Sequence, residues 1–512
     1  MHLDSKWSAL LPIIRDICSI SGIPGVSLGI VENHKTVYTA SLGYADIESK
    51  TPCDSDTTFV LGSLSKGLTA ALVASLHDDG TISSWDAPLK KLLPEFHRDD
   101  IYSEITLTDL LTHRTGLASL DSLWLASNNF IYSNFGYEIL GQVIEKTSGG
   151  LSAEVLRRRL LIPLGLFRTY HTDESRENEA RPYAALEDGS LVPIAPPLHG
   201  ENVLMGPAGG VRSSVNDLLA LYKAFMTAAY HEIIHPDTSS SDQPNSIIRA
   251  LEGTSIPTLP FPQGAFVRIR LGPGTITCRH LPGKRYKLTQ SYGWNMCTIT
   301  TGPVSRGIIP GFNTYNVLLS ETGSAVVVLT NSQSLNGGVR WIGELLVEAL
   351  LNNSHNAPDY TILGKQSAEI ALQQVKDINE SLAAGRTIET PSRPLEDYVG
   401  KYFNEAGNFF IEIGHSRDKA SLQVAYMGRK ADTFQLLPYR EDSFYWTLTH
   451  DESAKLAREP IFPMEYHITK FGSEINGTRV SCLWWQHQSG LPEPGELFTK
   501  TGREFERAQG EL

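Results

Sequence analysis

The sequence predicts a two-domain protein, with an α/β (α+β) domain over residues 1–388 and an antiparallel all-β domain over residues 389–512. Three observations support this division. A chain of 512 residues is longer than most single domains, each of which is built around one hydrophobic core. Helix-like and strand-like runs are mixed in the first part, whereas short strand-like runs separated by polar turns fill the last part. The segment Glu389–Pro394, which contains two prolines, marks the boundary between them.

Four helices are expected in the first domain. Residues 1–17 have the spacing of an amphipathic helix and lack the features of a cleavable leader. An apolar run over Leu68–Ser75 predicts a second helix, directly after an apolar strand-like run and a short polar turn. Further helices are predicted over Val215–Met226 and from about Gln366 to Ala384.

Short strands are expected throughout the second domain. Short β-like runs are separated there by polar turns, a pattern typical of an antiparallel barrel or sandwich. The candidates are Tyr398–Tyr402, Asn408–Ile413, Ser421–Tyr426, Ser443–Leu448 and Val480–Trp485.

A serine and a lysine stand three residues apart at the start of the second helix, in the sequence Gly62-Ser63-Leu64-Ser65-Lys66-Gly67. Positions i and i+3 of a helix lie on one face, so the Ser63 hydroxyl and the Lys66 amine can meet. A lysine in a dry pocket can lose its proton and activate a serine nucleophile. A second match, Ser416 to Lys419, follows an alternating run and is interpreted as a charged hairpin turn.

A phenol and a carboxamide stand two residues apart in Tyr132-Ser133-Asn134. Such a pair can enter a pocket from one loop, with Tyr132 carrying a proton and Asn134 hydrogen-bonding the lysine or a substrate. A similar triplet, Tyr402 to Asn404, lies in strand-rich sequence and does not share this context.

With these motifs in this order, the first 350 or so residues resemble the serine β-lactamase and penicillin-binding protein superfamily, especially its class C-like esterases and transesterases. Four more segments match the family in order: Ile23–Ile30, Thr106–Leu117, Ile162–Leu166 and Gly206–Leu218. The resemblance implies a β-lactamase/transpeptidase-like fold, with a central antiparallel sheet flanked by helices. It also implies a lipocalin-like C-terminal domain, as in some family members.

The resemblance further implies a serine hydrolase or acyltransferase that acts on an ester or amide of a small molecule, such as a secondary metabolite. Ser63 would be the nucleophile and Lys66 its base, while Tyr132 would protonate the leaving group. Asn134 would orient Lys66 and the substrate. No metal or organic cofactor is implied. A transesterase, in which an alcohol replaces water, would use the same residues.

The third motif of the family departs from its usual pattern. The family places Lys, His or Trp, then a small residue, then Gly on the strand beside the nucleophile, and Ser305-Arg306-Gly307-Ile308 is the corresponding stretch. Ser305 therefore replaces a cation that helps to bind substrate carboxylates. The backbone N–H groups of Ser63 and Ile308 would still form an oxyanion hole, since such donors do not depend on side-chain type.

Two alternatives remain open. The segment Ala118–Asn129 is shorter than its family counterpart, which together with Ser305 supports a catalytically silent binding protein on the same fold. The sequence His231-Glu232-Ile-Ile-His235 matches a zinc hydrolase motif, with Glu252 as a possible third ligand. Because Pro236 follows at once, a solvent-exposed helix end is the favoured interpretation of that motif.

Composition limits the partners that are expected. A net charge of −13 argues against nucleic acid or an anionic membrane surface. No apolar run reaches membrane-spanning length, so a cytoplasmic location is expected. The five cysteines are an odd number without a Cys-x-x-Cys pair, which disfavours a disulfide framework and predicts buried free thiols.

Overall fold

A computed structural model of the chain describes residues 3–96, 101–115, 133–172, 175–197, 206–234, 304–319, 322–352, 358–405, 407, 409–417, 419–473, 479–487 and 491–500. The described residues form two compact units, and their boundary falls between Ala368 and Glu369, inside helix α13 (Tyr360–Ala384). The predicted boundary at 388/389 lies between the end of α13 and the first strand of the C-terminal barrel at Gly400.

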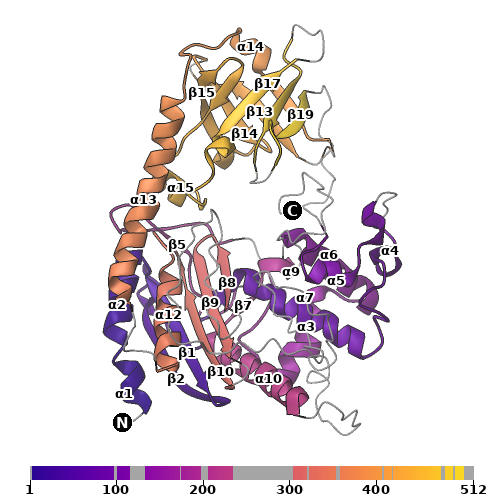
Figure 1. Cartoon of the computed structure of the whole chain (residues 1–512), viewed down its shortest axis with the longest axis vertical. Helices are drawn as coiled ribbons and strands as arrows, with labels where there is room; N and C mark the ends of the chain where they lie inside the picture. Colours follow the sequence, from indigo (N-terminus) through magenta and orange to yellow (C-terminus); the bar gives the residue numbers. More distant parts are fainter. Residues whose placement is uncertain are drawn as a thin grey trace, which may run out of the picture. The chain divides into compact units, whose positions relative to one another are not determined.

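The first unit is built on a six-stranded antiparallel sheet (Figure 1). Its strand order is β3-β2-β1-β10-β9-β8, so β8 lies at one edge. The strands are β1 (Gly25–Glu32), β2 (Lys35–Asp46), β3 (Thr51–Pro52), β8 (Val304–Ile309), β9 (Phe312–Leu319) and β10 (Ser324–Thr330). Seven of the eight residues of β1 are buried, as expected for a central strand covered on both faces.

Helices cover both faces of this sheet. On one face, apolar residues of α1 (Leu3–Ser8), α2 (Leu11–Ser21) and α12 (Gly338–Leu350) form a core with β1, β9 and β10. On the other face, α10 (Val215–Ile234) lies against β1. Gly29 of β1 permits this packing, because a Cβ there would lie 2.6 Å from the side chains of Val215 and Leu219.

The first unit also contains helix α3 (Ser65–Asp78), which a 3₁₀ turn, η1 (Gly62–Leu64), precedes, and several short helices and strands. The helices are α4 (Leu89–Leu92), α5 (Leu107–Leu111), α6 (Asn134–Ser148), α7 (Ser152–Leu156), α8 (Ile162–Leu164) and α9 (Gly206–Gly209), with 3₁₀ turn η2 (Ile101–Glu104) and a π-helical turn η3 (Arg157–Leu161). The short strands are β4 (Phe59–Val60), β5 (Tyr183–Ala185), β6 (Leu191–Pro193), β7 (Arg212–Ser213) and β11 (Ser332–Gln333).

The second unit contains a closed, eight-stranded antiparallel barrel in which each strand pairs with the next and β12 pairs with β19 (Figure 1). Its strands are β12 (Gly400–Phe403), β13 (Phe410–His415), β14 (Leu422–Tyr426), β15 (Thr433–Arg440), β16 (Ser443–Tyr445), β17 (Ile468–Gly472), β18 (Cys482–Trp485) and β19 (Glu496–Lys500). The unit also contains the C-terminal part of α13, helices α14 (Leu395–Tyr398) and α15 (His450–Lys455), and 3₁₀ turns η5 (Lys430–Asp432) and η6 (Met464–His467).

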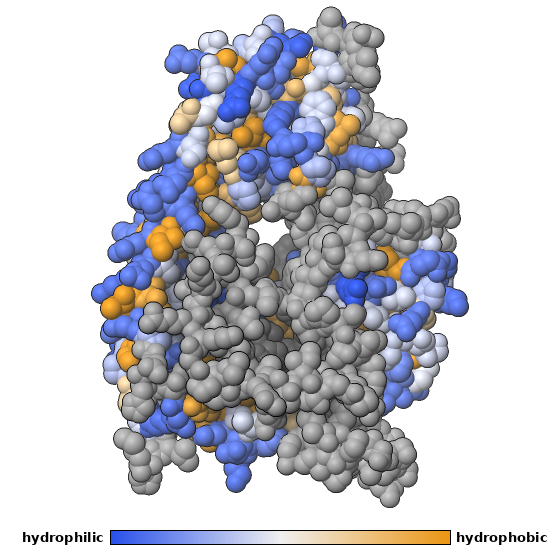
Figure 2. Space-filling model, in the orientation of Figure 1, coloured by the Kyte–Doolittle hydropathy of each residue, from blue (hydrophilic) through white to orange (hydrophobic). Residues whose placement is uncertain are grey.

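The predicted fold class, a mixed helix-and-sheet domain with an all-β C-terminal domain, is confirmed by these two architectures. The barrel closes around aromatic side chains. Phe434 stacks on Trp446 with ring centroids 4.4 Å apart, and Tyr426 stacks on Trp485 at 4.6 Å. All four residues are buried and belong to one hydrophobic cluster of the second unit. Figure 2 shows mainly hydrophilic side chains, with scattered apolar ones, on the described surface of the barrel.

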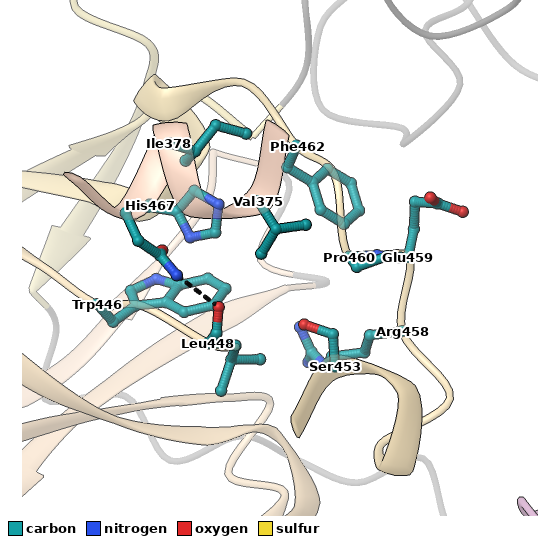
Figure 3. Close-up of a pocket in the computed structure, with 11 residues that line it drawn as sticks. Val375, Ile378, Trp446, Leu448, Ser453, Arg458, Glu459, Pro460, Phe462 and His467 are labelled. Carbon is teal, nitrogen blue, oxygen red and sulfur yellow. Dashed lines mark hydrogen bonds between the residues drawn. The ribbon is translucent and has the colours of Figure 1, made fainter. Parts of the chain in front are cut away.

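A small pocket in the second unit lies where the C-terminal part of α13 meets the barrel (Figure 3). Val375 and Ile378 of α13 line it together with Trp446 and His467. The Asn379 carboxamide donates a hydrogen bond to the Leu448 carbonyl oxygen over 3.0 Å, which ties the helix to the barrel at this point. The pocket is therefore part of the packing between α13 and the barrel.

None of the helices in the described ranges is long and apolar enough to cross a bilayer. Cys18, Cys53 and Cys482 are buried free thiols, as predicted, while Cys278 and Cys297 lie outside the described residues.

Candidate active site

Ser63 lies in the 3₁₀ turn η1 that leads into α3, rather than in the first turn of the α-helix itself. Gly62, just before it, has a φ of 55°, a left-handed conformation that glycine adopts without strain. The turn lies directly against edge strand β8, because a Cβ at Gly62 would be 3.0 Å from the Ile308 nitrogen. The backbone N–H groups of Ser63 and Ile308 therefore belong to neighbouring segments.

A glycine and a threonine hold this turn to the sheet. A Cβ at Gly307 would lie 1.8 Å from the Leu61 carbonyl oxygen, so no larger residue fits there without backbone movement. Thr314, opposite Gly307 on β9, accepts a hydrogen bond from the Gly307 N–H over 3.0 Å. Its hydroxyl donates to the Leu61 oxygen over 3.1 Å. Sequence reasoning missed Thr314, because nothing local to β9 signals a partner 253 residues away.

Lys66 lies on α3 with its side chain fully buried. Its Nζ is 3.3 Å from Ser63 Oγ, 2.7 Å from Asn134 Oδ1 and 2.8 Å from the Ala208 carbonyl oxygen. The two motifs predicted to meet thus do meet at this amine. The carbonyl of Ala208 is a third partner, which sequence reasoning missed because a backbone oxygen has no residue-type signal.

Burial lowers the pKa of Lys66 to about 7, since the charged ammonium loses its hydration. A neutral amine has two N–H bonds and one lone pair. The carbonyl oxygens of Asn134 and Ala208 can only accept, so they take the two N–H bonds. The lone pair can then point to the Ser63 hydroxyl, and this is the arrangement that a general base for Ser63 needs.

The segment that carries Ala208 is bound to α3 and to the strand before it. The Leu61 N–H donates to the Val211 oxygen over 2.8 Å, and the Val211 N–H donates to Ser65 Oγ over 3.1 Å. Thr69 Oγ1 donates to the Pro207 oxygen over 2.7 Å. These bonds fix the carbonyl that faces Lys66.

Ser305 lies on edge strand β8, opposite Asn316 of β9 in the ladder and on the same strand face as Gly307. The Asn316 carboxamide is fully buried and neither of its polar atoms has a hydrogen-bond partner in the described structure. The residue pair at this position of the ladder, Ser305 and Asn316, therefore carries no charge. Ile308, next to Gly307, is about half exposed.

Several predicted residues fall outside this geometry. Tyr132, the segment Ala118–Asn129 and His235 lie outside the described residues. His231 and Glu232 lie on α10, and their side chains are not among those described. In the described ranges, no group of three or more His, Cys, Asp or Glu residues is arranged to hold a metal ion.

The second Ser-x-x-Lys match, Ser416 to Lys419, and the second Tyr-x-Asn match, Tyr402 to Asn404, both lie in the barrel unit and have structural roles. Ser416 and Lys419 lie in the turn between β13 and β14, where the Lys419 N–H donates to the Ser416 carbonyl oxygen over 2.9 Å. The predicted hairpin turn is thus confirmed. Tyr402 is fully buried in the barrel and donates to the Tyr398 oxygen over 2.6 Å.

Comparison with known proteins places these observations in context. The Beta-lactamase family model matches residues 13–349. The "Unguisins hydrolase ungD'" of Aspergillus campestris is 25% identical, with 90% of this chain and 86% of that protein aligned. The "Unguisins hydrolase ungD" of Aspergillus violaceofuscus is 24% identical, over 75% and 72% of the two chains. The octameric penicillin-binding protein homologue from Pyrococcus abyssi is 20% identical, covers 98% of this chain and 100% of its own, and has a TM-score of 0.49.

The contacts of Thr314 generate a stability prediction. Thr314→Val removes the hydroxyl and leaves the buried Gly307 N–H and Leu61 oxygen without this partner, which costs about 1–3 kcal/mol. The unfolding midpoint should fall for Thr314→Val and stay near that of the wild type for Thr314→Ser, which keeps the hydroxyl. Thermal unfolding of the three proteins side by side measures the difference. Equal midpoints for the Val and Ser variants would contradict the role of the hydroxyl.

The burial of Lys66 generates a pH prediction. The amine can accept a proton only when neutral, so acylation of Ser63 by an uncharged reagent should accelerate as pH rises through about 7 and level off above it. The labelling rate of the Lys66→Met variant should not rise with pH in this range. The measurement is the labelling rate across a pH series. A rate that keeps rising toward the usual lysine pKa of about 10.4 would show that Lys66 is charged in the folded protein.

Proposed function

Because the chain belongs to the beta-lactamase family of serine hydrolases, we propose that it cleaves an ester or amide bond of a small molecule through an acyl-Ser63 intermediate. The observation that carries this proposal is the Lys66 amine, which two carbonyl oxygens orient toward the Ser63 hydroxyl.

In the proposed acylation step, Ser63 Oγ attacks the substrate carbonyl carbon while Lys66 takes the hydroxyl proton. The N–H groups of Ser63 and Ile308 stabilise the oxyanion that forms. The bond to the leaving alcohol or amine then breaks. Tyr132 protonates that leaving group in this proposal, an assignment that rests on its sequence position next to Ser133 and Asn134.

Deacylation follows when a second nucleophile attacks the acyl-Ser63 carbonyl and gives its proton to the deprotonated Tyr132. The bond between the acyl carbon and Ser63 Oγ then breaks, and Lys66 returns its proton to Oγ. Water gives a hydrolase and an alcohol gives a transesterase, with the same residues in both cases. The two relatives named as unguisins hydrolases favour water. Their alignment spans most of both chains, which supports hydrolysis as the reaction here also.

The neutral pair Ser305 and Asn316 supports an uncharged group on the acyl side of the substrate. Family members hold a substrate carboxylate with a cation at the position of Ser305. Asn316, directly across the ladder, adds a carboxamide and no charge. We therefore propose neutral esters or amides as preferred substrates over penicillins and other carboxylates.

Substitution of the nucleophile tests the mechanism. Ser63→Ala should abolish labelling by a fluorophosphonate probe and lower ester hydrolysis by several orders of magnitude, because no acyl-enzyme can form. Ser416→Ala is the matched control, since it removes the serine of the second Ser-x-x-Lys match and should change neither readout. The measurements are gel fluorescence of the labelled protein and the rate of ester hydrolysis.

The same assay separates the alternatives. A wild-type protein that folds normally but never labels would support the catalytically silent binding protein. Activity that a chelator removes and zinc restores would instead promote His231, Glu232 and His235. The proposal expects labelling at Ser63 that a chelator does not affect.

A cation at position 305 should change substrate preference. A charge-assisted contact to a carboxylate is worth about 1.5–3 kcal/mol, or roughly tenfold to a hundredfold in affinity. Ser305→Lys should therefore raise kcat/KM for carboxylate-bearing esters by up to this factor, with little gain for neutral esters. Ser305→Met, of similar length and without charge, is the control. An efficient turnover of a penicillin by the wild type would contradict this interpretation of Ser305.

A further inference from the structure

A buried histidine lies behind the residues that hold Lys66. His113 follows helix α5 and is 1% exposed. Its Nδ1 accepts a hydrogen bond from the backbone N–H of Ser133 over 3.1 Å. Ser133 is itself buried and is the N-cap of α6, where its hydroxyl accepts from the Gly136 N–H. The next residue is Asn134, whose Oδ1 contacts Lys66.

The backbone at His113 is unusual for a residue with a side chain. Its φ is 57°, in the left-handed region that non-glycine residues seldom adopt. Strained backbone of this kind persists only where surrounding contacts impose it, and it is common near functional sites. Here the conformation accompanies an imidazole that lies against the Tyr137 ring, with centroids 5.3 Å apart.

The imidazole of His113 is in the neutral form that it needs to accept the hydrogen bond from Ser133. Burial, and then the charge of Lys66, lower the pKa of His113 to about 3. The ring is therefore neutral over the physiological range. Because Nδ1 accepts from Ser133, the ring proton is on Nε2 in this tautomer. Lys66 is also close to Tyr137, with its Nζ 5.6 Å from the ring centroid.

We propose that His113 is a positioning residue for the acyl-transfer step, because its Nδ1 fixes Ser133 and thereby holds Asn134 Oδ1 against the Lys66 amine. This inference rests on the proposed function for its effect on rate. Its structural part, the contact between His113 and the start of α6, stands without any activity. Nothing in this role requires His113 to touch the substrate.

Two substitutions at His113 separate the acceptor from the bulk of the ring. The amide oxygen of His113→Asn can take the place of Nδ1, and asparagine tolerates a positive φ. The amide of His113→Gln can take the place of Nε2 instead, beyond reach of the Ser133 N–H. The labelling rate of Ser63 should fall about tenfold or more in His113→Gln and recover most of that loss in His113→Asn.

A double-mutant cycle with Asn134 distinguishes positioning from general support of the fold. If His113 acts through Asn134, then His113→Gln should change the labelling rate less than about twofold in an Asn134→Ala background. An equal fall in both backgrounds would overturn the proposal, as would an unchanged rate in His113→Gln.

Hydrogen exchange of the Ser133 amide supplies a readout independent of activity. Protection should drop in His113→Gln and persist in His113→Asn. Unchanged protection in His113→Gln would show that His113 does not hold this amide. If wild-type Ser63 never labels, the proposed function fails, and the exchange result alone then decides whether the His113 contact exists in solution.

Discussion

The site depends on one constraint, the enclosure of the Lys66 amine away from water. An ammonium in such a place loses most of its hydration, which shifts its equilibrium toward the neutral amine. The protein places two carbonyl oxygens and a hydroxyl around Nζ, partners that suit a neutral amine. The same packing thus lowers the pKa of the amine and orients it, which is what the proposed role of Lys66 as a base for Ser63 requires.

Several distant segments must meet for this enclosure to form. Edge strand β8 packs against the η1 turn that holds Ser63, because Gly307 has no side chain and Thr314 bridges Gly307 to Leu61. The segment with Ala208 closes another side through its backbone bonds to Ser65 and Leu61. Asn134, the first residue of α6, contacts the amine from a third segment. The geometry around Ser63 is therefore a property of the folded first unit rather than of the local motif.

Local sequence predicted the parts of the site that depend on local spacing. The i, i+3 relation brought Ser63 and Lys66 together, although Ser63 lies in a 3₁₀ turn. The order of the motifs also pointed to Asn134. Thr314, the Ala208 carbonyl and the contact between His113 and Ser133 were missed, because each is a tertiary contact without a periodic or compositional signal. In the barrel, the sequence pattern did not predict β15. This strand contains Pro438, a residue that disfavours a strand, and its pairing with β16 shifts register between Pro438 and Arg440.

A direct titration of Lys66 tests the central claim. Protein labelled with ¹³C at the lysine ε-carbon gives one signal for each lysine, and the Lys66→Arg variant identifies the signal of interest. The account predicts that this signal titrates near pH 7, well apart from the exposed lysines. Titration near the ordinary lysine value of about 10.4 would contradict it, because Lys66 would then be an ammonium at neutral pH and would have no lone pair for Ser63.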